Sequence, residues 1–140
     1  MTTKEYLSRA YGFKKDINTR TAQIRALREV AERSTSSVNA LRVGGTSERS
    51  PMANAVDKII DCQKLIQRDI DRLLGAQKEI AETISKVENH TYRQVLELRY
   101  LSFKKWWEIA DILDKTERWI FKLHGKALQE ISKIICDSSL

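Results

Sequence analysis

The side chains most often found in metal centres are few in this chain and lie far apart. Two histidines and two cysteines are present, and in chain order they are Cys62, His90, His124 and Cys136. Successive members are separated by 28, 34 and 12 residues, whereas zinc sites usually contain ligand pairs only a few residues apart. The chain also lacks a glycine-rich phosphate loop and a nucleophile motif. We therefore expect no metal, no cofactor and no enzymatic activity.

Basic side chains recur with helical spacing near the C-terminus and indicate a different kind of chemistry. Arg118, Lys122 and Lys126 are spaced by four residues, and Lys115 lies one turn earlier. The opposite face of the same helix would carry the apolar side chains of Ile120, Leu123, Ala127 and Ile131. In the major groove of DNA, an arginine fork matches guanine and lysines reach phosphates. An isolated stripe of this kind is more often a solvated surface, so the residues before it decide between the two readings.

Those preceding residues have the pattern of a helix-turn-helix unit, in which two short helices cross beyond a tight turn. A small residue, Ala110, stands where the second helix would cross the first. Asp114 stands at the turn, and aspartate adopts left-handed backbone more readily than most residues, although glycine is commoner there. Apolar side chains flank the crossing at Ile109, Leu113, Ile120 and Leu123. We therefore predict that the helix over 116–131 reads the major groove.

The predicted DNA-binding residues come from this helix and from the start of the helix before it. Lys104 and Lys105 open the earlier helix, where contacts to the DNA backbone are common. Glu117 either accepts a hydrogen bond from cytosine or interacts with the positive end of its helix. The complete predicted set is Lys104, Lys105, Lys115, Thr116, Glu117, Arg118, Phe121, Lys122 and Lys126.

Three short motifs follow one another between Tyr92 and Ile131. They are VLELRY at 95–100, EIA at 108–110 and KAL at 126–128. Together they resemble region 4 of the sigma-70 family, and the chain is similar to small phage-encoded regulators of the ArpU and RinA type in Gram-positive bacteria. The resemblance covers about 40 of the 140 residues. It implies binding to double-stranded DNA, transcriptional control and contact with the host RNA polymerase.

The sequence departs from sigma factors in two respects. Sigma region 2 is absent, so the chain is not a complete promoter-melting factor. Trp106, Trp107 and Trp119 are bulkier than the residues usual in region 4, and we expect one or two of them in the core of the small domain. Trp119 falls on the predicted reading helix; we expect it to pack in the core or at a domain interface, with stacking on DNA as the alternative.

The rest of the sequence predicts long helices. Thr2 and Glu5 have the spacing of a capping box, and an apolar pattern with helical period continues over 3–33. Residues 34–50 are rich in Ser, Thr and Gly and predict a loop. Ser50 and Pro51 form a helix-start signal, and the second helix would run to about residue 87.

One face of this second helix carries a heptad seam that needs a partner. The predicted oligomerisation residues are Ile59, Ile66, Ile70, Leu73, Ile80 and Ile84. The first helix covers the seam as an antiparallel hairpin, or a second copy of the chain covers it, or a hairpin dimerises. Gln63 and Gln77 occupy positions of the same seam. Either they are buried and set the register in which the helices pair, or they lie at the edge and are solvated.

Beyond His90 the pattern changes to three short helices, predicted over 92–101, 103–113 and 117–135 after the capping residues Thr91, Ser102 and Thr116. We therefore predict an all-α chain in two parts. Residues 1–89 would form a helical hairpin or coiled coil for oligomerisation, most simply as a dimer. Residues 90–140 would form a small helix-turn-helix domain like sigma-70 region 4 that binds DNA.

The charge distribution is compatible with a nucleic-acid partner. The net charge is +6, of which residues 1–50 carry +5, residues 51–89 carry −1 and residues 90–140 carry +2. No apolar run is long enough to span a membrane, and the two cysteines form no disulfide pattern. We therefore expect the cytoplasm of a bacterial host cell and no membrane partner.

The function most consistent with these patterns is a phage-encoded transcriptional regulator that binds double-stranded DNA with sequence specificity. Two alternatives remain. One is a sigma-like adaptor that binds RNA polymerase, which the small +2 charge of residues 90–140 keeps open. The other is a packaging protein like the small terminases, which the order of the parts makes less attractive.

Overall fold

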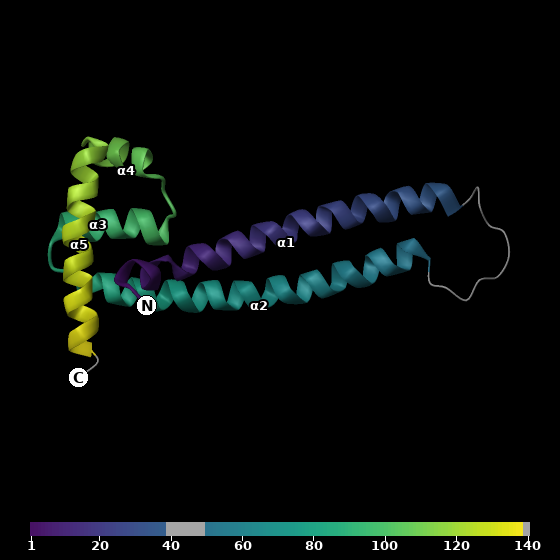
Figure 1. Ribbon diagram of the computed structural model, residues 1–140, viewed down its shortest axis with the longest axis horizontal. Coiled ribbons are helices and arrows are strands. Elements are labelled where there is room, and N and C mark those ends of the chain that lie inside the picture. Colours follow the sequence, from purple (N-terminus) through teal and green to yellow (C-terminus); the bar gives the residue numbers. More distant parts are fainter. Residues whose placement is uncertain (39–49, 139–140) are drawn as a thin grey trace. The chain divides into compact units, whose positions relative to one another are not determined.

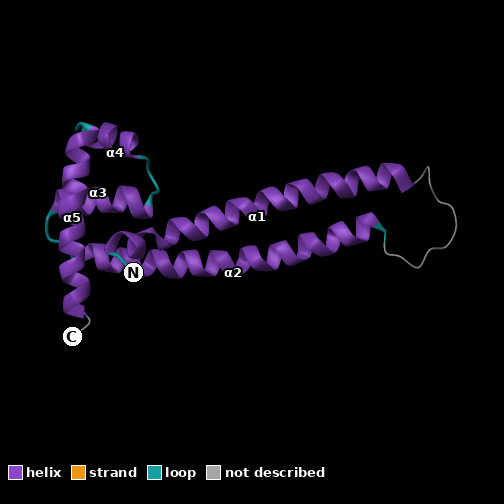
Figure 2. Cartoon of the chain, in the orientation of Figure 1, coloured by secondary structure: helices purple, strands orange, loops and turns teal. Residues whose placement is uncertain are grey.

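The computed structural model describes residues 1–38 and 50–138, and within these ranges the chain is helical with no strand (Figures 1 and 2). The elements are α1 (Thr3–Val38), α2 (Pro51–Ser85), α3 (His90–Leu96), the π-helical turn η1 (Glu97–Leu101), α4 (Trp106–Leu113) and α5 (Glu117–Ser138). The predicted all-α class is confirmed.

Three helix starts follow the predicted local signals. The Thr2 backbone N–H donates to Glu5 Oε2 at 2.9 Å, and the Glu5 N–H donates to Thr2 Oγ1 at 3.1 Å, which completes the capping box. Ser50 Oγ accepts from the Ala53 N–H at 3.1 Å. Thr116 Oγ1 accepts from the Trp119 N–H at 3.1 Å. Each bond satisfies a backbone donor that has no partner inside its helix.

The predicted loop over 34–50 begins later than expected. Helix α1 continues to Val38, because its Ser and Thr residues disfavour a helix only weakly. The remainder of that loop, 39–49, lies outside the described residues.

The predicted starts of two short helices were wrong. Asn89 caps α3, since its Oδ1 accepts from the Tyr92 N–H at 3.1 Å, and Thr91 lies inside the helix. Helix α4 begins at Trp106 because Phe103 has a φ of 57°, a left-handed conformation that a right-handed helix cannot contain. The predicted helix over 92–101 changes from an α-helix to a π-helix at Glu97. There the Ser102 N–H donates to the Glu97 carbonyl, five residues earlier, at 3.0 Å.

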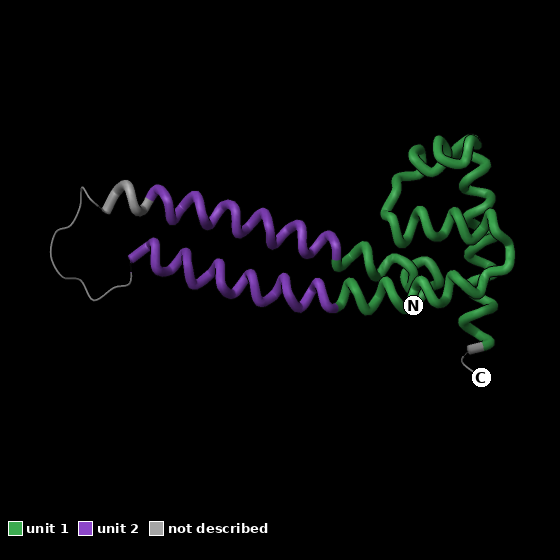
Figure 3. The backbone as a smooth tube through the Cα atoms, turned by 180° about the vertical axis from the view of Figure 1, so that it is seen from behind, with its two compact units in different colours: residues 1–13, 72–140 green, residues 14–71 purple. Residues whose placement is uncertain are grey.

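The described chain divides into two compact units, coloured separately in Figure 3. Unit 1 contains residues 1–13 and 72–140, and unit 2 contains residues 14–71. Unit 1 therefore includes residues from both predicted regions, 1–89 and 90–140.

Unit 1 is built around two hydrophobic clusters. The first joins the start of α1, the end of α2 and the C-terminal helices; its fully buried members are Leu7, Ala10, Ile80, Leu96, Ala127 and Ile131. The second cluster joins α3, α4 and α5 through Val95, Ile109, Ala110 and Ile120. Helix α5 contributes to both clusters, so its buried face runs along much of its length.

Tyr100, a member of the first cluster, forms a buried polar pair with His124. Tyr100 Oη and His124 Nε2 share a hydrogen bond of 2.6 Å. Burial raises the pKa of Tyr100 to about 12. Burial, together with the positive charges of Lys4 and Arg99, lowers the pKa of His124 to about 4. Both side chains are therefore neutral near pH 7, which suits their low-dielectric surroundings.

Unit 2 consists of α1 and α2 residues that pack against each other in antiparallel directions. Ile24 and Ala55 are buried there. Arg20 Nε donates to Asp69 Oδ2 at 2.7 Å, and only 3% of Asp69 is exposed. This ion pair is the buried polar contact of the unit. The sequence left open whether Gln63 and Gln77 are buried polar residues of the seam or solvated. Gln63 is exposed, and Gln77 in unit 1 is half-buried.

The Arg20–Asp69 pair should stabilise the fold. Replacing Arg20 with alanine leaves a buried carboxylate without its partner, and we expect the free energy of unfolding to fall by about 1–3 kcal/mol. Replacing both residues with leucine should recover much of this loss, because no buried charge remains. Urea unfolding of the two variants measures the effect. A double variant less stable than Arg20→Ala would contradict the account.

His124 should make folding stability depend on pH. The folded pKa of about 4 lies below the ordinary 6.5, so between these values the unfolded chain binds more protons. The free energy of unfolding should therefore fall as the pH drops through this window. His124→Phe should flatten that dependence in urea titrations. His90→Gln is the matched control, because His90 is exposed; equal slopes for wild type and His124→Phe would contradict the prediction.

Candidate functional site

The predicted basic stripe lies on the exposed face of α5. Lys115, Arg118, Lys122 and Lys126 are all exposed. The opposite face of the helix is fixed in the core, where Ile120, Ala127 and Ile131 are 0% exposed. The helix thus presents three cations on the side that its own packing leaves open, and Lys115 adds a fourth from the turn before it.

The turn before α5 has the backbone that the sequence predicted. Asp114 has φ 54° and ψ 50°, in the left-handed region. The Lys115 N–H donates to the Ala110 carbonyl at 2.9 Å, which closes the end of α4 in the manner of a Schellman motif. This turn joins α4 to α5 through three residues, Asp114, Lys115 and Thr116, so the start of α5 is held close to the end of α4.

The two lysines before α4 are positioned by a second left-handed residue, Phe103. The Lys104 N–H donates to the Leu98 carbonyl at 2.9 Å, and Arg99 Nη1 donates to the Lys104 carbonyl at 3.0 Å. Lys105 is exposed and Lys104 is half-buried. The backbone carrying these cations is therefore tied to η1, an arrangement that the sequence did not predict.

Trp106 connects α4 to α5 through its indole ring. The ring meets Phe121 edge-on at 5.2 Å and His124 at 4.6 Å between centroids. The Arg99 guanidinium lies over it at 4.3 Å. Arg99 was not among the predicted site residues, although the match to a VLELRY motif includes it. Of the three tryptophans, Trp106 packs partly in the core as expected.

Trp107 and Trp119 are exposed instead. The exposed fractions are 55% and 48%, so the expectation that Trp119 packs in the core was wrong. Trp119 directly follows Arg118 and lies one turn before Lys122, and Lys122 Nζ approaches its ring centroid to 6.0 Å. The same indole borders a hollow of about 520 Å³ with Asp114, Lys115 and Thr116. The remaining predicted residues, Glu117 and Phe121, are exposed as well.

The predicted oligomerisation residues have different environments. Ile80 and Ile84 are 0% and 1% exposed in the core of unit 1, so they offer no surface to another chain. Ile59, Ile66 and Ile70 in unit 2, and Leu73 in unit 1, are half-buried. Ile80 and Ile84 are therefore closed to a second copy, whereas the half-buried residues keep part of their surface exposed.

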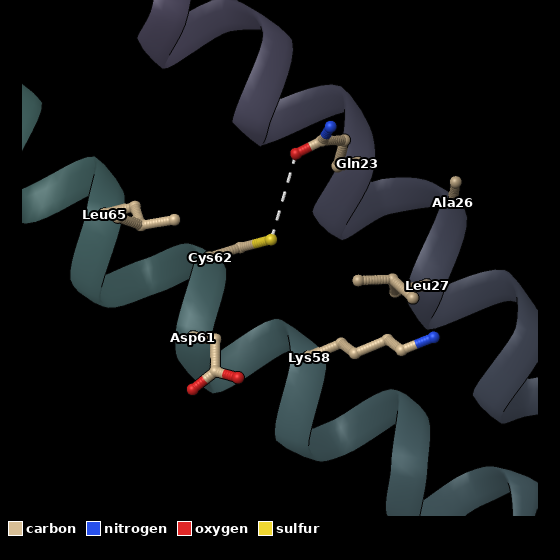
Figure 4. Close-up of a pocket in the computed structure, with 7 residues that line it drawn as sticks. All are labelled: Gln23, Ala26, Leu27, Lys58, Asp61, Cys62 and Leu65. Carbon is tan, nitrogen blue, oxygen red and sulfur yellow. Dashed lines mark hydrogen bonds between the residues drawn. The ribbon is translucent and has the colours of Figure 1, made fainter.

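A second hollow lies between α1 and α2 in unit 2 (Figure 4). It measures about 450 Å³, and Leu27, Leu65 and Cys62 border it. The Cys62 thiol donates weakly to Gln23 Oε1 at 3.9 Å. Gln23, Ala26, Lys58 and Asp61 complete its lining.

The described residues form neither a metal site nor a membrane-spanning helix. Nowhere among them do three His, Cys, Asp or Glu side chains gather as a metal would require. None of the helices described has an apolar stretch long enough to cross a bilayer.

The chain matches the family described as "Protein of unknown function (DUF1492)" over residues 32–132. No curated protein and no solved structure matches it. The matched region includes α2 to α4 and most of α5, and it spans well over half of the 140 residues. The chain therefore belongs to the DUF1492 family.

Proposed function

We propose that this chain is a sequence-specific regulator of transcription that binds double-stranded DNA through α5. In this proposal α4, the turn at Asp114 and α5 form a helix-turn-helix domain of the sigma-70 region 4 type. The single observation that carries it is the exposed row of Arg118, Lys122 and Lys126 on a helix that is anchored on its opposite face by the fully buried Ile120, Ala127 and Ile131. A helix anchored in this way can enter the major groove without rearranging.

Each cation has a role that follows from its chemistry. Arg118 lies in the first turn of α5, where recognition helices meet base edges, and its fork matches guanine. Lys122 and Lys126 lie farther along the helix and bind phosphates. Lys105, at the start of α4, adds a phosphate contact on the other side of the groove.

Exposed Trp119 extends the proposed surface beyond charge. It lies at the first turn of α5, beside Lys122, with half of its surface in water. An indole in that position packs on deoxyribose or a thymine methyl and excludes water from neighbouring ion pairs. This supports the stacking alternative that the sequence analysis left open.

The resemblance to phage-encoded regulators supports the same assignment, and we propose that the protein acts in an infected bacterial cell. A homodimer would present two copies of α5 to two half-sites. A second candidate function, the adaptor that binds RNA polymerase, is favoured by one observation. Trp107 and Ile112 of α4 are more than half exposed, and such apolar side chains are frequent in protein interfaces.

Loss of the two central cations should abolish specific DNA binding. We expect Arg118→Ala/Lys122→Ala to weaken binding to a selected duplex by about 100-fold or more, since each good arginine–base contact contributes about 1–3 kcal/mol of discrimination. Gel-shift titration measures the affinity, and circular dichroism checks that helicity is unchanged.

The matched control removes the same charge elsewhere. Lys78 and Lys86 are exposed on or after α2, and Lys78→Ala/Lys86→Ala should leave specific binding nearly intact. If both double variants lost the same DNA affinity, net charge alone would explain the effect, and the proposed role of α5 would be overturned. Retained binding in Arg118→Ala/Lys122→Ala would do the same.

Salt dependence separates DNA binding from the adaptor function. Binding through several phosphates should weaken steeply between about 50 and 200 mM salt. Lys126→Ala should weaken binding equally on all sequences and reduce the slope of log affinity against log salt by about 1. A flat salt profile, together with capture of RNA polymerase without DNA, would favour the adaptor.

A further inference from the structure

A glycine lies within the outward face of α5. Gly125 is exposed and stands well inside Glu117–Ser138, eight residues after the helix begins. Glycine destabilises the interior of a helix relative to alanine, so a glycine at such a position needs a reason. The packing of the chain supplies none, because a methyl group on its Cα would meet no atom of the described chain within 4 Å, apart from the local helix backbone.

A second glycine shows that this openness alone decides nothing. Gly75 in α2 is also exposed, and a methyl group on its Cα would be equally clear of the described residues. The residues one turn away from Gly75 are Asp71, Arg72, Lys78 and Glu79. Their charges cancel, so the surroundings of Gly75 favour no charged partner.

The charge around Gly125 is, by contrast, not balanced within its helix. Lys122 precedes Gly125 by three residues, and Lys126 follows it directly. The residues three and four positions from Lys122 are Arg118, Trp119, Gly125 and Lys126. None of them is acidic, and cations four residues apart on a helix repel each other. Lys126 has an acidic neighbour one turn later, Glu130, so Lys122 is the cation whose charge α5 leaves unbalanced.

We infer that Gly125 is the point at which one sugar–phosphate strand of the bound duplex passes closest to the backbone of α5. Arg118 lies seven residues before it, about two turns, and therefore on the same face. The missing side chain leaves room for a phosphate between Lys122 and the exposed Gln129, which lie one turn before and one turn after. Lys122 supplies the positive charge, and Gln129 supplies an amide donor. The half-exposed ring of Phe121 packs on the deoxyribose.

The inference rests on the proposed function, because it takes the anion to be DNA. The two fail differently in the same titration. A wild-type chain that binds no duplex would overturn both. A wild-type chain that binds a selected duplex no better than its Gly125 variants do would overturn this inference alone.

The test compares Gly125→Ala and Gly125→Gln in the full chain. Both new residues form helices better than glycine, so both variants should unfold at a higher urea concentration than wild type. Both should bind the selected duplex more weakly in gel-shift titrations. Gly125→Gln should lose at least about tenfold in affinity, since its longer side chain keeps the strand away from α5. If the fold required this glycine, replacing it would lower both stability and affinity.

Gly75→Gln is the matched control. It should raise the stability of the chain in the same way and leave the DNA affinity unchanged, because no strand passes over α2 in this proposal. An unchanged affinity in Gly125→Gln, or the same loss in Gly75→Gln, would overturn the inference.

Neutral methylphosphonate linkages, placed one at a time along the duplex, identify the group that lies at Gly125. Neutralising the linkage held by Lys122 should weaken binding by the wild type and matter less for Lys122→Ala. The same linkage should also matter less for Gly125→Gln, because the strand no longer reaches the lysine. If Gly125→Gln kept the full sensitivity to that linkage, the strand would not pass over Gly125, and the inference would be wrong.

Discussion

Burial of one face of α5 is the constraint on which the rest of unit 1 depends. Ile120 belongs to the cluster formed with α3 and α4, whereas Ala127 and Ile131 belong to the cluster formed with α1 and α2. His124 lies between them and is held by Tyr100. Because side chains of α5 are buried in both clusters, the orientation of the helix about its own axis is fixed. Its cationic face is therefore fixed outward, as the proposed groove contact requires.

The N-terminal residues belong to this arrangement. Leu7 and Ala10 are 0% exposed in the first cluster, so the start of α1 is part of the core that holds α5. Tyr6 Oη reinforces the contact by donating to Glu79 Oε1 at 3.3 Å. The ends of the long helices thus complete the unit that carries the candidate site. Truncation of the first helix would consequently disturb the packing of α5.

The features that could be predicted from the sequence are local. Thr2, Ser50 and Thr116 act within three residues of their bonding partners, and Asp114 needs only its own backbone preference. The periodicity of α5 identified both of its faces because a helix of 22 residues samples the pattern over six turns. The basic stripe therefore lies where the sequence placed it.

The features that escaped prediction depend on distant residues. From the sequence, Asp69 is expected on the surface. It is buried because its carboxylate pairs with Arg20, which lies 49 positions earlier in the chain. The cap of α3 is an exception, because asparagine is a better cap than threonine, and the local preference already favoured Asn89 over Thr91. Trp119 has a size typical of core residues, but the buried face of α5 is already filled by Ile120 and Leu123. Ile80 and Ile84 read as an intermolecular seam because periodicity does not reveal whether the covering helix comes from the same chain.

The central claim is that the outward face of α5 reads DNA sequence. Selection of bound duplexes from a random pool by the wild-type chain, followed by sequencing, tests it most directly. The account predicts enrichment of a palindrome whose half-sites are separated by about one helical turn or a multiple of it. A bound pool with no enriched sequence would contradict the claim.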